Sequence, residues 1–398
     1  MLYKYTLVTP DGTRTQQTLE AKTVDRLKTI VQVNGNLAVD IKEAGALNQD
    51  VDLGRVTVKD LAMFCQQMKS IVKAGVTAVD ALEMVASTTK CKKLKKTTLS
   101  CVERVRTGVP ISDTMLDYPE IFPLIMCQMI KAGEASGRLD EIFDRLAVQF
   151  EKSYKLKNTI KKALAYPKMI MVVVIIALIV VCTAVVPMFV DIFKQLNTEL
   201  PITTKFFILL SDLFTKYWLP TLVVAIILIT TWILFSRSEE GQKFIDRTKL
   251  KLPLVKNLEV KTASANLART LSTLLDSGLD YPKALEIARD TMSNYYFKEG
   301  VETIRIDVMN GLTLTQSLKK TGLFPELLEN LLQIGEDTGN VEEMLNNSAT
   351  YFEEEVETAT LQLTSVLQPI IIIIMGVFIG LLVYSIYSPM FSMYKGIG

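Results

Sequence analysis

The 398-residue sequence contains no histidine. That absence removes the commonest general base, the commonest metal ligand and the nucleophile pairs of Ser-His and Cys-His enzymes. No GxxxxGK[ST] segment occurs, and no glycine-rich phosphate loop follows a strand-like run. The sequence therefore predicts no enzymatic activity, no catalytic residue and no cofactor, and any energy the protein uses has to come from another protein.

Cysteine is scarce, and its five copies are scattered without any CxxC spacing. Zinc-ribbon and thioredoxin-like sites are therefore not indicated, and no metal site is predicted. An odd number of widely spaced cysteines is typical of reduced thiols in a reducing compartment. The five are Cys65, Cys91, Cys101, Cys127 and Cys182.

Charge of one sign is not in excess, because 44 basic and 43 acidic residues leave a formal net charge of +1. No strong global field favours nucleic acid as a partner. The segment Met1–Gly12 has no basic stretch followed by an apolar core, so we expect no cleavable signal peptide.

Long apolar runs are what the sequence does have. Met169–Val190, Tyr217–Phe235 and Ile370–Phe391 each approach or exceed the roughly 20 residues that cross a bilayer. The cores of these runs hold no carboxylate or amine side chain. Proton relays and ion pathways usually need such groups, so the pattern predicts membrane spans and leaves a transporter or channel as a remote alternative.

Basic residues indicate the orientation of these spans. Lysines precede the first span and basic residues follow the second, so the positive-inside rule places Met1–Lys168 and Ser236–Gln368 in the cytoplasm. Four acidic residues before the third span disagree, but acids weigh little in that rule. The basic residues are Lys152, Lys155, Lys157, Lys161, Lys162, Lys168, Arg237, Lys243, Arg247, Lys249 and Lys251, and the acids are Glu353, Glu354, Glu355 and Glu357.

The two predicted cytoplasmic parts repeat each other. In both, apolar residues at helical spacing are closed by a glycine suited to the left-handed position after a helix. The offset is 203 residues from Gly75 to Gly278 and from Gly108 to Gly311, and 202 from Pro123 to Pro325. A single deletion explains that register. Each copy is predicted to be a six-helix antiparallel bundle with short loops.

Each copy also contains a Gly-Glu-x-x-Gly turn and ends in a long sixth helix. The turns are Gly133-Glu134-Ala135-Ser136-Gly137 and Gly335-Glu336-Asp337-Thr338-Gly339. The sixth helix and its span cover about 50 residues, or roughly 75 Å. Pro167 and Pro369 are expected to kink these helices where they enter the membrane. Such a rod could carry a cytoplasmic motion into the bilayer, or it could be a simple anchor.

The N-terminal region differs from the repeats and predicts a small α/β appendage. Leu2–Val8 and Thr15–Leu19 read as strands around a turn at Pro10-Asp11-Gly12, Thr23–Val33 reads as a helix, and Asn48–Gly54 reads as a linker. The predicted fold is thus an all-α membrane protein of two tandem six-helix cytoplasmic bundles and three transmembrane helices, with this appendage. The predicted boundaries are 1–54 for the appendage, 55–168 and 236–368 for the bundles, 169–190, 217–235 and 369–394 for the spans, and 191–216 for an extracytoplasmic loop.

Three features leave functional and structural interpretations open. Glu134 and Glu336 oppose the dipole at a helix end, so they either accept from backbone amides at the start of the sixth helix or contact a basic partner. A lysine cluster is either a solvated face or a contact for anionic lipid or a partner. Gly376 and Gly380 permit close helix approach, within the chain, between copies or with another protein's helix. The cluster comprises Lys90, Lys92, Lys93, Lys95 and Lys96.

This ordered set resembles the PilC/GspF family of inner-membrane platform proteins from type IV pilus and type II secretion machines. The resemblance covers nearly the whole chain: the appendage, the duplicated bundle, the helix-ending glycines, both Gly-Glu turns and the Tyr166-Pro167 pair. One departure is Gln368, where the first copy has Tyr166.

The resemblance implies a homo-oligomer, at least a dimer, in the cytoplasmic membrane. It implies that the platform contacts a hexameric ATPase, pilin or pseudopilin helices and other assembly proteins, and that ATP turnover moves it so that pilin subunits enter a type IV pilus. A type II secretion or competence pseudopilus is the alternative. A membrane receptor is a further hypothesis, disfavoured by the short predicted outer loop.

Overall fold

The protein is described by a computed structural model covering residues 2–8, 14–20, 37–43, 55–188, 208–209, 211–213 and 216–396. The chain divides into two compact units. One consists of Met1–Val56 with Thr89–Lys96, and the other of Thr57–Thr88 with Thr97–Gly398.

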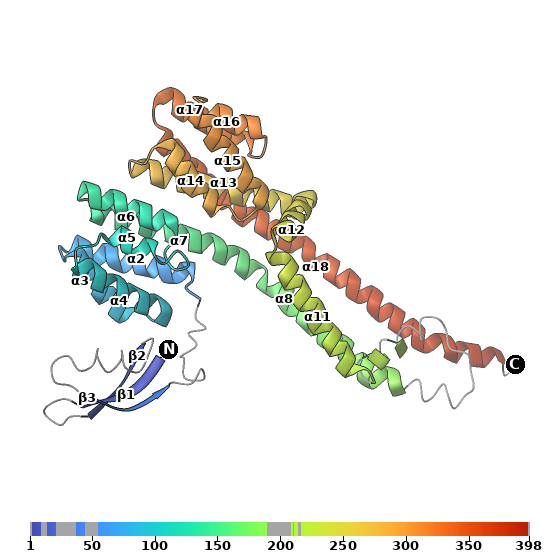
Figure 1. Ribbon diagram of the computed structural model, residues 1–398. Coiled ribbons are helices and arrows are strands. Elements are labelled where there is room, and N and C mark those ends of the chain that lie inside the picture. Colours follow the sequence, from blue (N-terminus) through green and yellow to red (C-terminus); the bar gives the residue numbers. More distant parts are fainter. Residues whose placement is uncertain are drawn as a thin grey trace. The chain divides into compact units, whose positions relative to one another are not determined.

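The first unit contains a three-stranded antiparallel sheet with the order β2-β1-β3 (Figure 1). Strand β1 (Leu2–Val8) pairs with β2 (Arg14–Glu20) and, through an irregular register, with β3 (Leu37–Glu43). The first two strands were predicted, whereas β3 was missed although Leu37, Val39 and Ile41 alternate as a strand requires. The predicted turn at 10–12, the helix at 23–33 and the linker at 48–54 lie outside the described residues.

The first copy of the repeat is a run of six helices, as predicted. Thr57 begins α2: its hydroxyl accepts a hydrogen bond from the Asp60 N–H, and the Asp60 carboxylate accepts one from the Thr57 N–H. α2 packs along the length of α7, where Phe143 and Leu146 are fully buried. The helices are α2 (Val58–Lys73), α3 (Ala78–Thr88), α4 (Lys92–Arg106), α5 (Ile111–Leu116), α6 (Leu124–Ser136) and α7 (Leu139–Ala163).

The second copy has the same six helices, and α13 packs along α18 as α2 does along α7 (Figure 1). An additional helix, α12 (Glu239–Lys251), precedes it and was not predicted, although Ser238 caps its start. The buried Asp246 carboxylate of α12 accepts from the Tyr295 N–H at 2.9 Å. The six helices are α13 (Pro253–Asp276), α14 (Tyr281–Thr291), α15 (Tyr295–Met309), α16 (Leu314–Thr321), α17 (Glu326–Thr338) and α18 (Val341–Gly396).

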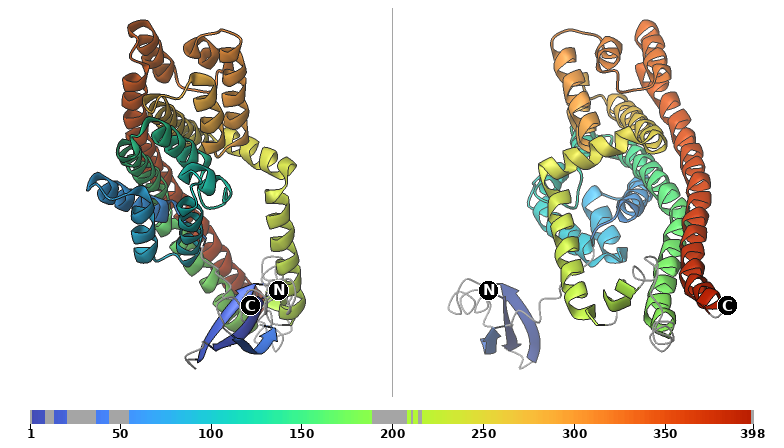
Figure 2. Two further views of the ribbon diagram at one scale, coloured as in Figure 1. Left: turned by 60° about the vertical axis from the view of Figure 1, so that its left-hand side comes forward. Right: turned by 90° about the vertical axis from the view of Figure 1, so that its right-hand side faces the viewer.

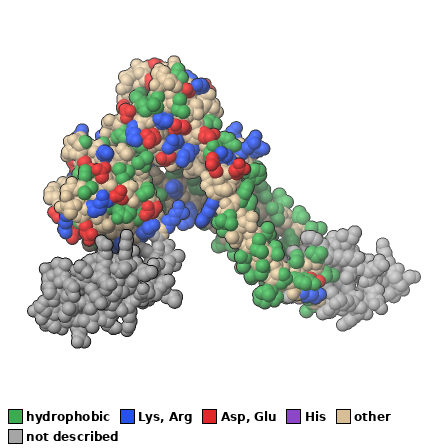
Figure 3. Space-filling model, viewed as in Figure 1, with side chains coloured by type: hydrophobic (Ala, Val, Ile, Leu, Met, Phe, Trp, Pro, Cys, Tyr) green, Lys and Arg blue, Asp and Glu red, His purple; other side chains and the backbone are tan. Residues whose placement is uncertain are grey.

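Three helices of the described chain are long and apolar enough to cross a bilayer, which confirms the predicted spans. The first is α8 (Ala165–Val180), which widens to a π-helix, η3, over Val181–Val185. The second is α11 (Trp218–Arg237), and the third is the C-terminal part of α18. Figure 3 shows their hydrophobic side chains gathered on the surface, while charged side chains cover the bundles. α8 lies against α18 (Figure 2).

Both sixth helices enter their spans beside a proline. α7 ends at Ala163, and α8 begins two residues later with Pro167 in its first turn. Leu164 between them keeps a right-handed helical conformation, its N–H donates to the Ile160 carbonyl at 3.1 Å, and its carbonyl accepts from the Lys168 N–H at 3.2 Å. α18 continues through Pro369 over 56 residues. The helical path therefore runs from the bundle into the span in both copies, although each proline removes one backbone donor.

Candidate functional site

The Gly-Glu turn of the first copy joins α6 to α7. Glu134 lies in the last turn of α6, and its carboxylate reaches the start of the short helix α5. It accepts hydrogen bonds from the N–H groups of Ile111 at 2.5 Å and Ser112 at 3.2 Å, and from the Ser112 hydroxyl at 2.5 Å. α5 is preceded by Pro110, whose side chain cannot cap it. Glu134 therefore satisfies amides that the helix leaves unpaired.

The second copy reproduces this arrangement. Glu336 accepts from the N–H of Leu314 at 2.7 Å and from that of Thr315 at 3.3 Å, at the start of α16. Each carboxylate thus lies at the positive end of a helix dipole, which offsets its unfavourable position at the end of its own helix. The carboxylates were expected to accept from the sixth helix. They cap the fourth instead, because the fourth helix lies beside the turn in the folded bundle.

The glycines of the turn have separate roles. A Cβ on Gly133 would stand 2.8 Å from Ile142 Cγ1, and one on Gly335 would stand 3.0 Å from Val341 Cα. The first glycine of each turn therefore lets the sixth helix pass close by. The last ones, Gly137 and Gly339, end the helix at φ of 71° and 69°.

The other helix-ending glycines have the same geometry in both copies. Gly75 and Gly278 have φ of 85° and 86°, and Gly108 and Gly311 have φ of 93° and 91°. All four lie in the left-handed region that favours glycine.

The two bundles meet at a polar seam, defined by Arg145, Gln149 and Lys152 on α7. Arg145 pairs with Asp276, and the Thr273 hydroxyl donates to Gln149 Oε1 at 3.1 Å. Lys152 Nζ lies 3.1 Å from Glu353 Oε2 on α18. These residues follow one another at i, i+4 and i+7, so a single face of α7 makes all three contacts.

Arg269 fastens α13 to α18 beside the seam. Its Nε donates to Glu353 Oε1 at 2.8 Å and its Nη2 to Thr350 Oγ1 at 3.2 Å, and it also bonds Asn346. The Arg269 side chain is 9% exposed and that of Glu353 is 15% exposed. Glu353 therefore bridges both bundles. This contact gives a structural role to Glu353, one of the four acidic residues before the third span that disagreed with the positive-inside rule.

Comparison with known sequences identifies the family. A sequence model described as "Type II secretion system (T2SS), protein F" matches residues 64–187 and again residues 267–389. The chain belongs to the type II secretion system protein F family. The two matches begin 203 residues apart and end 202 residues apart, which are the offsets found between the glycines and between Pro123 and Pro325, and this confirms the repeat.

Individual members of the protein F family align with almost the whole chain. The type IV pilus assembly protein PilC of Thermus thermophilus is 32% identical over 98% of both chains. PilC of Pseudomonas aeruginosa is 33% identical over 86% of this chain and 92% of its own. The type II secretion system protein F of Xanthomonas campestris is 29% identical over 100% of both.

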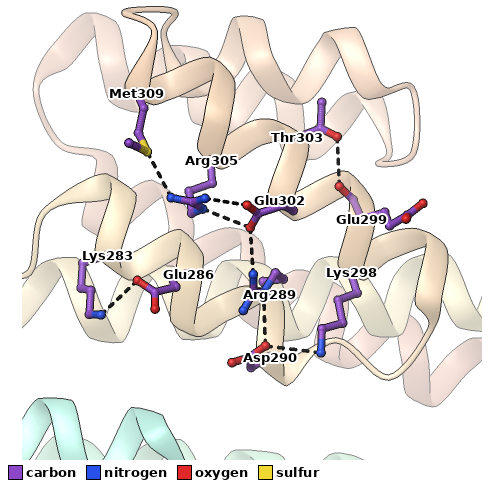
Figure 4. A network of polar contacts seen from close by, with 10 residues as sticks. All are labelled: Lys283, Glu286, Arg289, Asp290, Lys298, Glu299, Glu302, Thr303, Arg305 and Met309. Carbon is purple, nitrogen blue, oxygen red and sulfur yellow. Dashed lines mark hydrogen bonds and ion pairs between the residues drawn. The ribbon is translucent and has the colours of Figure 1, made fainter. Parts of the chain in front are cut away.

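Ion pairs join the second and third helices of the second copy, as Arg106 and Glu83 do in the first. Figure 4 shows ion pairs that connect α14 to α15, with Glu302 between Arg289 at 3.1 Å and Arg305. The hydrogen bond from Arg305 lowers the pKa of the Glu302 carboxyl. Its stabilising effect is therefore present above the ordinary glutamate pKa and lost as pH falls through the lowered value. Arg305 also donates to Met309 Sδ.

The lysine cluster and the cysteines of this family member stand apart from those networks. Among the described residues, no carboxylate lies within ion-pair distance of the cluster, whose side chains are exposed or half-buried. Cys91 is half-buried, while the other four cysteines are buried. Burial raises the pKa of the Cys127 thiol to about 12 and also raises those of Cys65 and Cys101. The described residues contain no cluster suited to a metal ion.

The glycine pair of the third span is open. No atom lies within 4 Å of a Cβ built on Gly376 or Gly380. The described residues outside this helix thus place nothing close against either glycine.

Proposed function

We propose that this protein is the inner-membrane platform of a type IV pilus. It couples a hexameric cytoplasmic ATPase to the insertion of pilin subunits into the growing filament and does not itself hydrolyse ATP. The supporting observation is similarity over nearly the full length to proteins named for type IV pilus assembly. Both bundles lie in the cytoplasm, following the positive-inside pattern, and the platform is a homo-oligomer.

The polar seam supports a mechanical role. Contacts between charged and hydroxyl-bearing side chains near a surface contribute little net free energy each, because water replaces them readily. The bundles can therefore change their relative tilt at a small cost. α18 is continuous from its bundle through the third span, so a tilt of the second bundle moves a rod of roughly 84 Å.

A type II secretion platform is the second candidate, because the Xanthomonas protein F aligns over both full lengths. Four of the relatives, at 28% to 33% identity, carry pilus assembly names, which favours the pilus. Pili that are lost when the gene is deleted, with secretion unaffected, would support the first candidate. The converse result would support the second.

The direct test of the platform is ATPase association. The full chain in detergent is expected to retain the hexameric assembly ATPase encoded in the same cell during affinity purification. A variant in which Arg145 and Lys152 are both changed to Gln removes the two ion pairs through which a tilt of one bundle is passed to the other, and is expected to reduce piliation at unchanged protein level. The change of Lys283 to Gln, in a half-exposed pair with Glu286 away from the seam, is the matched control. Normal piliation in the seam variant would contradict the tilting mechanism.

Orientation can be tested with the native thiols. Cys91 is the accessible cysteine, because the other four are buried. In intact cells we expect a membrane-impermeant maleimide to leave the protein unlabelled, and in inverted vesicles to label it once. The change of Cys91 to Ser should abolish that label. Labelling of Cys91 in intact cells would place the first copy outside the cytoplasm and end the proposed coupling to an ATPase.

A further inference from the structure

A cavity of about 570 Å³ lies between the two bundles on the side that leads to the membrane. Ligand sites commonly have volumes of about 300–1,000 Å³. Its wall on the first bundle is mainly apolar and includes Leu61, Leu156 and Ile160. Its wall on the second bundle is mainly polar and includes Thr262 and Asn266. A cavity with one apolar and one polar wall suits an amphiphile.

The helix directions place this cavity near the bilayer. α2 runs antiparallel to α7, since Lys69 pairs with Asp144 toward one end and Val58 lines the cavity together with Ile160 at the other. Ile160 precedes Met169, where the first apolar run begins, by nine residues. At 1.5 Å per residue the cavity is therefore about 13 Å from that run along the helix.

The charges in the cavity leave one cation uncompensated. Among its lining residues, Asp290 pairs with Arg289 and Lys298, and Glu259 lies 3.9 Å from Lys249. Burial raises the pKa of the Glu259 carboxyl. Lys157, by contrast, has no carboxylate within ion-pair distance among the described residues. The Thr262 hydroxyl is also buried without a hydrogen-bond partner.

Further lysines continue from the cavity to the membrane. The juxtamembrane lysines are Lys157, Lys161, Lys162 and Lys168, and the described residues supply no carboxylate partner to any of them. The second copy carries Ala359, Leu363, Thr364 and Ile370 at the matching positions. The sixth helix therefore folds and enters the membrane without lysines there. Their presence in the first copy calls for a role beyond the bundle fold.

We propose that this cavity and the juxtamembrane lysines bind an anionic phospholipid. Its phosphate lies between Lys157 and Lys161, and an acyl chain lies against Leu156 and Ile160. Basic pockets at the cytoplasmic surface of a membrane recognise phosphate head groups in this way. A lipid held there would couple the first bundle to the bilayer beside the α7–α8 junction. The inference requires only that the protein spans the membrane, and it is independent of the proposed function.

The test is native mass spectrometry of the full chain in detergent, titrated with phosphatidylglycerol or with phosphatidylcholine. We expect preferential retention of phosphatidylglycerol. Changing Lys157 and Lys161 to Gln is expected to weaken it by roughly fivefold per lysine. The control changes Lys92 and Lys96 to Gln, which removes the same charge from another surface and should leave retention unchanged. Equal retention of both lipids, or equal loss in the control, would overturn the proposal.

A second variant tests the cavity without changing its charge. Thr262→Leu fills the polar wall and is expected to reduce phosphatidylglycerol retention while leaving the elution volume in gel filtration as in the wild type. If this variant does not fold, the lysine variants still decide the matter. A competition experiment with inorganic phosphate completes the test. Complete displacement of the lipid by millimolar phosphate would indicate a site for the anion alone and would contradict an acyl-chain contact.

Discussion

Changing Arg269 to Ala is expected to lower the free energy of unfolding of the second bundle by about 3–5 kcal/mol. Removing one partner of a buried pair leaves the other charge uncompensated in a poorly solvated place. Here the group left behind is Glu353: its Oε1, which accepts from Arg269 at 2.8 Å, loses its charged donor, and only Oε2 keeps a partner, Lys152. For a domain of this size the loss corresponds to roughly 6–20 °C in the melting temperature.

Thermal unfolding of the full chain in detergent measures this effect, with the change of Arg247 to Ala as the exposed control for loss of one arginine. Changing both Arg269 and Glu353 to Met is expected to recover most of the lost stability, because the apolar pair leaves no buried charge unpaired and Lys152, the other partner of Glu353, is 37% exposed. A melting temperature within 2 °C of the wild type for the single variant would show that Lys152 alone compensates Glu353.

Changing Glu134 and Glu336 together to Gln is expected to destabilise both bundles. Hydrogen bonds to a charged acceptor contribute about 1.5–3 kcal/mol each, and an amide directs its NH2 group at one of the donors. The protein level in the membrane should fall, and piliation should fall in parallel. Quantitative immunoblotting together with counts of pili per cell measures both.

The matched controls are Asp140 to Asn and Asp337 to Asn, which remove one charge beside each turn from exposed side chains. If the Glu variant lost piliation at a normal protein level, the carboxylates would be partner contacts rather than helix caps. Unchanged piliation with an unchanged level would contradict both interpretations. The hydrogen bonds in both copies favour the role of helix cap, because each carboxylate already accepts from two backbone amides.

Features carried by local periodicity could be predicted without the structure. The spans, the six helices of each copy and the glycines that end them depend on residues within a few turns of one another. The membrane-spanning runs are also self-contained, because a helix satisfies its own backbone in lipid. The repeat register needed only the comparison of two stretches of one sequence.

Two elements were missed although their signals are present. The alternation of Leu37, Val39 and Ile41 marks β3, and Ser238 followed by two glutamates marks the start of α12. Each signal is short. Around α12, the basic residues were used only to predict the orientation of the chain in the membrane. Short elements depend on their partners, as α12 depends on the contact of Asp246 with α15.

The amino-acid order alone determined that this protein is a duplicated helical module attached to three membrane spans, since each helix and span is specified by side chains close together in the chain. Only the tertiary structure decided where the charged groups go. Glu134 finds amides 22 and 23 residues away, and Lys152 finds a carboxylate 201 residues away. Such pairings depend on which surfaces meet after folding, and a polar side chain at a helix surface has many partners that sequence spacing cannot rank.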